Sequence, residues 1–76
     1  MNKLRRKELE GIHNKLGEIK TDIETLRDEE QEYIDNMPES LQGSERATNA
    51  ENSVSNMDDA IENLEEVISS IEEAAA

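Results

Sequence analysis

Apolar residues recur at alternating steps of three and four positions along two stretches of this chain. In the first stretch they fall at positions a and d of a heptad that starts with Leu9 at a, and only Glu30 interrupts the series. The second stretch runs without interruption from Ala47, which is also at position a, to Ala75. This repeat is typical of amphipathic helices that pack through a coiled-coil-like seam. The apolar a and d residues are Leu9, Ile12, Leu16, Ile19, Ile23, Leu26, Tyr33 and Met37, and then Ala47, Ala50, Val54, Met57, Ile61, Leu64, Ile68, Ile71 and Ala75.

Residues 38–44 form the predicted joint between the two helices. Pro38 lacks a backbone N–H and disfavours helical geometry in the residue before it, so the first helix should end near this point. Ser44 is suited to cap the second helix, and Leu41 is expected to fold back over this end of the pair. The sequence therefore predicts an all-α chain, a single domain over residues 1–76, with helices at about 2–37 and 45–74.

A joint this short makes the two helices antiparallel neighbours, and the two heptads then fix which residues face each other. The bulky Tyr33 is expected opposite the small Ala50 in the seam. Position e carries a basic row in the first helix and an acidic row in the second, and antiparallel helices bring these rows together. The predicted pairs are Arg27 with Asp58, Lys20 with Glu65, and His13 with Glu72.

Position g of the second helix is occupied by small residues, which widen its apolar stripe beyond what a two-helix seam requires. A wider stripe is typical of a helix in a four-helix bundle. The sequence thus predicts a homodimer of hairpins, and the alternative is a monomer that tolerates small residues at g. The residues expected to mediate self-association are Ala60, Val67, Ala74, Ile61, Leu64 and Ile68.

Composition narrows the possible functions. The 76 residues include no cysteine and a single aromatic residue, Tyr33, so a disulfide framework and a deep aromatic pocket are not expected. The net charge of −12 argues against direct binding of nucleic acid or of anionic membranes. No apolar stretch follows the basic residues 1–7, so we expect no secretory signal and a cytoplasmic protein, in the host cell if a phage encodes it.

Few residues suggest catalytic or metal chemistry. Glu10 and His13 have the Glu-x-x-His spacing of di-iron bundles, but heptad positions b and e should keep both out of the core. Glu30 is the one charge in the seam; it is either a functional buried acid or, as the more common case, a polar residue that sets register. We therefore expect neither an enzyme nor a bound metal or cofactor.

Acidic residues are distributed unevenly along the chain. Residues 1–20 carry six Lys and Arg against three Glu, whereas residues 21–76 carry 17 Asp and Glu against two Arg. Rows of carboxylates on a rigid rod can imitate a phosphate backbone, although they can equally serve as a solvated surface. The carboxylates expected on outer, partner-binding faces are Asp28, Glu29, Glu32, Asp35, Asp59, Glu62, Glu66 and Glu73.

Residues 29–46, which include the joint Asn36-Met37-Pro38-Glu39-Ser40-Leu41-Gln42-Gly43-Ser44, resemble a group of short acidic proteins. Phages and prophages of Gram-positive bacteria encode that group. The resemblance covers most of the chain and implies a small phage accessory protein, but it assigns no role to any residue. Because many small acidic phage proteins act as inhibitors, it favours a protein that binds and inhibits a host protein, such as a nucleic-acid-binding or defence protein. The alternative is a scaffolding bundle without inhibitory activity.

Overall fold

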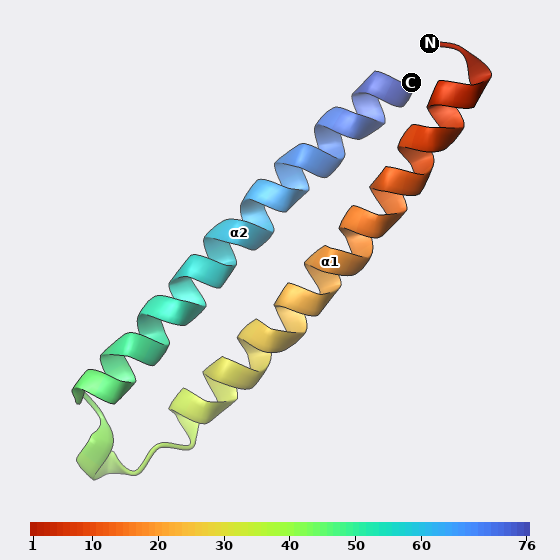
Figure 1. Ribbon diagram of the computed structural model, residues 1–76. Coiled ribbons are helices and arrows are strands. Elements are labelled where there is room, and N and C mark those ends of the chain that lie inside the picture. The colour runs from red at the N-terminus through yellow and green to blue at the C-terminus, as the bar shows by residue number, and fades with distance from the viewer.

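The computed structural model describes residues 1–76 as a hairpin of two long helices (Figure 1). Helix α1 spans Lys3–Asp35 and helix α2 spans Glu45–Ala75, and a short 3-10 turn at Glu39–Leu41 lies between them. The helices run antiparallel, so the two termini lie together at the open end of a rod that measures 60 × 14 × 12 Å. The fold is therefore all-α, as the heptads predict.

Side-chain caps define where each helix begins. The Asn2 side chain accepts a hydrogen bond from the Arg5 backbone N–H at 2.8 Å, and Ser44 accepts one from Ala47 at 3.2 Å. Each cap satisfies an N–H group that has no partner inside its helix. Gly43, directly before Ser44, has a φ of 79°, a value that glycine adopts without steric cost. The expected cap at Ser44 is thus confirmed.

The joint contains a polar contact that the sequence does not predict. Leu41, expected over this end of the hairpin, is 37% exposed. The side-chain amide of Gln42, the next residue, donates to the carbonyls of Ile34 at 3.4 Å and of Met37 at 3.2 Å. These carbonyls lie at and just beyond the last turn of α1, where acceptors lack intrahelical donors. Gln42 therefore adds a polar cap at the end of α1.

The seam between the helices uses a different side of α1 from the predicted one. Ile34, at position e, is buried, whereas Tyr33, at position d, is 43% exposed and does not fill the seam opposite Ala50. The other d residues of α1 are also exposed: Ile12 and Ile19 at 47% each, and Leu26 at 57%. Turning α1 about its axis in this way brings the e row inward, where it buries Ile34 and places three cations next to α2.

The core of the hairpin is thin. Only five of the 76 residues are buried, and no large side chain is completely buried. Four of the five lie at or near the joint, and Ile61, in the middle of α2, is the fifth. The buried residues are Ile34, Met37, Ala47, Ala50 and Ile61. Neither helix contains an apolar stretch long enough to cross a membrane.

Candidate protein-binding surfaces

Three ion pairs join the e row of α1 to the e row of α2. Arg27 Nη1 lies 2.9 Å from Asp58 Oδ1, Lys20 Nζ lies 3.3 Å from Glu65 Oε1, and His13 Nε2 lies 3.2 Å from Glu72 Oε1. All three are the pairs that the heptad register predicts. Because they are partly exposed, each contributes little to stability, and their main effect is to select one register.

Arg27 is the most highly connected of the three cations. It also reaches Asp28, the next residue in α1, with its Nη2 at 3.1 Å from Oδ1. The hydrogen bond to Asp58, followed by the one to Asp28, raises the pKa of Arg27 above its ordinary value. Asp28, predicted on an outer face, is therefore partly neutralised by its neighbour.

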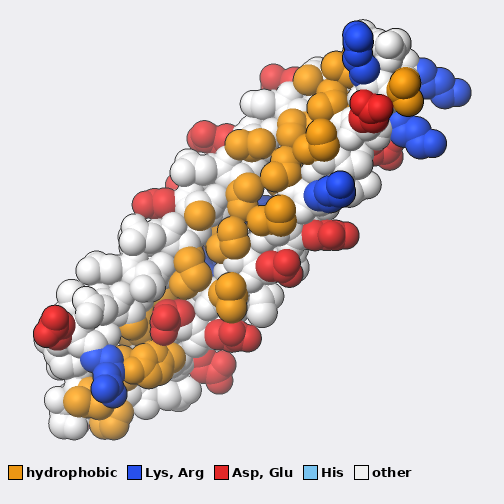
Figure 2. All heavy atoms as spheres, viewed as in Figure 1, with side chains coloured by type: hydrophobic (Ala, Val, Ile, Leu, Met, Phe, Trp, Pro, Cys, Tyr) orange, Lys and Arg blue, Asp and Glu red, His pale blue; other side chains and the backbone are white.

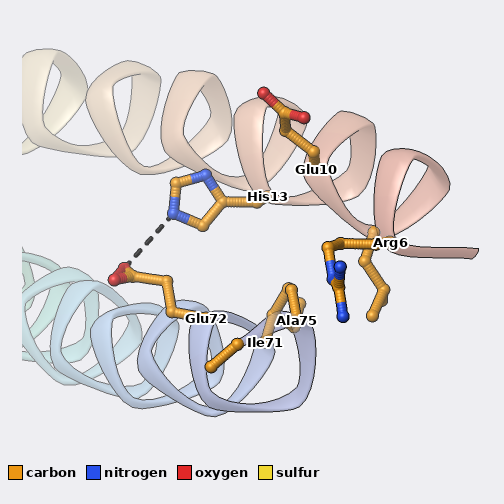
Figure 3. A pocket seen from close by; sticks show the side chains of 8 residues that line it. Arg6, Glu10, His13, Ile71, Glu72 and Ala75 are labelled. Atoms are coloured by element: carbon orange, nitrogen blue, oxygen red, sulfur yellow. Dashed lines mark hydrogen bonds and ion pairs between the residues drawn. The ribbon is translucent and has the colours of Figure 1, made fainter. Parts of the chain in front are cut away.

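A shallow hollow of about 290 Å³ lies between the helices at the open end of the rod (Figure 3). His13 and Glu72 form one wall, and Ile71 and Ala75 contribute apolar surface. The hydrogen bond to Glu72, and then the contact with Asn14, raises the pKa of His13 above its ordinary value. No hydroxyl or thiol side chain lines this hollow.

Glu10 and His13, which have di-iron spacing in the sequence, do not converge. The Glu10 carboxylate points away from the His13–Glu72 pair (Figure 3). No group of three or more His, Cys, Asp or Glu residues lies close enough together to hold a metal ion.

Glu30 lies in the seam at intermediate burial, next to a shallow depression shared with Leu26, Glu29 and Met57. Its carboxylate has no ion-pair partner. A carboxylate that keeps access to water needs no such partner. This position matches the register-setting interpretation better than that of a buried functional acid.

All eight carboxylates predicted on outer faces are exposed. Two of them have partners in the chain: Asp28 contacts Arg27, and Asp35 accepts a hydrogen bond from Gln31 Nε2 at 2.9 Å. The carboxylates of the remaining six form no hydrogen bond or ion pair within the chain. These six are Glu29, Glu32, Asp59, Glu62, Glu66 and Glu73. Acidic side chains flank both long margins of the face seen in Figure 2.

The residues predicted to mediate self-association differ in accessibility. Ile61 is only 6% exposed because it packs within the hairpin. Ala60, Leu64 and Ile68 are half-buried, whereas Ala74 is exposed and Val67 is 45% exposed. The d row of α1, which the heptad predicts in the seam, adds four exposed residues on the same side of the rod: Ile12, Ile19, Leu26 and Tyr33.

Comparison of the chain with protein-family models, with curated proteins and with solved structures found no match.

Proposed function

We propose that this chain is a non-enzymatic binding protein that contacts a basic surface on a host protein through the acidic outer faces of its two helices. Contact of this kind would inhibit a protein whose basic surface serves to bind nucleic acid. The observation that carries the proposal is the set of six exposed carboxylates without partners, held on long helices. The helices fix the backbone of these residues, so a basic partner would order only their side chains on binding.

The charge density of the rod is relevant to this proposal. A net charge of −12 over a length of 60 Å corresponds to one net charge per 5 Å. Duplex DNA carries about one charge per 1.7 Å of axis, so a single rod has about a third of that density. A rod of this charge density would compete with nucleic acid for a basic protein surface through contacts that are weak and sensitive to salt. The resemblance of residues 29–46 to short acidic phage proteins supports the same inhibitory role.

The acidic-face proposal predicts a specific loss of binding. The triple variant Asp59→Lys, Glu62→Lys, Glu66→Lys should weaken retention of a captured host protein by at least about tenfold, the loss expected for several charge contacts. The measurement is affinity purification from host cells at about 0.05 and 0.3 M salt, followed by binding titration with each captured DNA-binding protein or nuclease. In the wild-type chain, retention should fall as salt rises.

The matched control keeps the charge and changes only the side-chain length: Asp59→Glu, Glu62→Asp, Glu66→Asp. This variant should bind as the wild type does, and helical circular dichroism should be the same for all three proteins. If no captured nuclease or DNA-binding protein shows salt-sensitive retention, the acidic-face proposal fails. It fails equally if the lysine variant binds as well as the control.

A second candidate function is a scaffolding bundle that only holds partners together. The exposed apolar row of α1 favours it, because such a row can join helices without any acidic contact. In this case, the triple lysine variant would keep full function, and Leu26→Lys would abolish it. The two variants therefore separate the two functions.

A further inference from the structure

One long face of the rod is apolar and lacks a partner within the chain. It contains Ile12, Ile19, Leu26 and Tyr33 of α1, which are 43–57% exposed, together with Val67 of α2 at 45%. Figure 2 shows hydrophobic side chains in a row along the long axis of the molecule on the viewed face. We call these five residues the apolar row. A row of this length on so small a chain marks an interaction surface.

The part of α2 next to the apolar row carries no charge. Between Ala47 and Ala75, every acidic residue lies at heptad position b, e or f. Positions c and g are filled by Asn49, Asn56, Asn63 and Ser70, and by Ser53, Ala60, Val67 and Ala74. In a chain with a net charge of −12, eight uncharged positions along one side of a helix form a surface suited to close approach by another protein.

We propose that a second copy of this chain covers this face, and that the two hairpins lie antiparallel in a four-helix bundle. The inference does not rest on the proposed function, because it is carried by the apolar face and involves only Glu29 among the six carboxylates without partners.

Surface area supports a second copy as the occupant. The chain exposes 5683 Å². A compact monomer of 8.6 kDa exposes about 4,700 Å², so this hairpin has about 1,000 Å² in excess. A stable interface buries about 800 Å² on each partner. One copy docked along the 60 Å face would therefore remove most of the excess surface.

Charge selects the antiparallel arrangement. The half of the rod toward the joint, residues 21–63, has 13 Asp and Glu against two Arg, a net charge of −11. The open half, residues 1–20 and 64–76, has seven Asp and Glu against six Lys and Arg, a net charge of −1. An antiparallel dimer places each strongly acidic half beside a nearly neutral one. A parallel dimer would place the two acidic halves together.

The spacing of the apolar row fits the same arrangement. With a two-fold axis midway along the row, Ile19 meets Leu26 of the second copy, and Ile12 meets its Tyr33. Lys15, at position g beside the row, then comes close to Glu29 of the second copy, and this ion pair occurs twice in the dimer. The same register places Asp22, also at g, opposite its counterpart at the axis, so two ion pairs stand against one like-charge contact. The charge-free sides of the two α2 helices also meet.

The mass in solution is the first test. Sedimentation equilibrium at about 100 µM should give about 17 kDa, which is twice the 8.6 kDa of one chain. Leu26→Lys should weaken the dimer at least about 100-fold, because each dimer loses two buried leucines and gains two buried amines. Asn52→Lys adds the same charge at position f, away from this face, and should leave the mass unchanged. Leu26 is 57% exposed in the hairpin, so its replacement leaves the fold of each chain intact.

The orientation is tested by spin labelling, since the chain has no cysteine of its own. A label on a Ser40→Cys variant lies at the joint, and the antiparallel dimer separates the two labels by about 50 Å, the length of about 35 helical residues. A separation under about 20 Å, two interhelical spacings, would show the parallel dimer and overturn the proposed arrangement.

A mass of one chain at 100 µM would leave the apolar face to a different protein and overturn the proposal. A dimer that survives Leu26→Lys would overturn it as well.

Discussion

At the scale of single residues, His13 is the group whose state changes within the physiological pH range. Its Nε2 lies 3.2 Å from Glu72, and this contact favours the protonated imidazole. The raised pKa means that the imidazole of His13 binds its proton more tightly in the folded chain than in the unfolded one. The stabilisation is complete below the ordinary histidine pKa of about 6.5 and is lost as pH rises through the raised value.

Lowering the pH from about 8 to about 6 should therefore raise the thermal midpoint of unfolding, on the order of 1–2 °C for an exposed pair. Glu72→Gln should remove most of this pH dependence. Glu73→Gln makes the same change in net charge at an exposed carboxylate without a partner, and it should keep the dependence. Circular dichroism melts at the two pH values measure the difference. Equal pH dependence in the two variants would show that His13 gains nothing from Glu72.

At the scale of the elements, the glycines have different consequences for the helices and for the joint. Gly17 lies in the interior of α1, and a Cβ atom added there would meet nothing within 4 Å. Gly43 also has open space around it, but its φ of 79° is strained for any residue with a Cβ atom. Space is thus equal at the two positions, and only the backbone conformation differs.

The same substitution should have opposite effects at these two positions. Gly17→Ala should stabilise the hairpin by about 0.5–1 kcal/mol, because alanine loses less conformational entropy on forming a helix. Gly43→Ala should destabilise it by about 1 kcal/mol, because alanine does not tolerate positive φ. Urea unfolding followed by circular dichroism measures both changes. A loss of stability for Gly17→Ala would show that α1 needs a glycine there for a reason other than its backbone.

At the scale of the whole molecule, two electrostatic effects oppose each other. Three pairs between the helices stabilise the hairpin, with His13 charged only when it is protonated, and each contributes little because it is exposed to solvent. The net charge of −12 acts against compactness, because folding brings the carboxylates of both helices into one narrow rod. The repulsion involves many more groups than the three pairs, so it should dominate.

Raising NaCl from about 0.02 to about 0.5 M should therefore increase the thermal midpoint by several degrees, because salt screens the repulsion among exposed charges. The measurement is a thermal melt at constant protein concentration, so that any dimerisation contributes equally at each salt level. A lower midpoint at high salt would mean that the three ion pairs outweigh the net repulsion.

Much of the molecule follows from the sequence because it depends on residue spacing. The heptads and the joint at Pro38 predict two antiparallel helices, and the charged e rows predict which residues pair. The pairs of Arg27 with Asp58 and of Lys20 with Glu65 are found as predicted. The exposure of the eight outer carboxylates follows from the same heptad positions. Spacing determines these features because a helix places residues at fixed angular and axial intervals.

Only the tertiary structure decided how α1 is rotated about its own axis. An apolar stripe covers more than 100° of a helix, so a heptad is compatible with a seam formed by a and d or by a and e. Which of the two seams forms depends on whether Tyr33 or Ile34 packs better against α2. It also depends on whether the cations of the e row can contact the carboxylates of α2. That balance buries Ile34, leaves Tyr33 43% exposed, and presents the apolar row to the outside. The Gln42 cap was likewise decided in three dimensions, because it depends on the path of the joint past the end of α1.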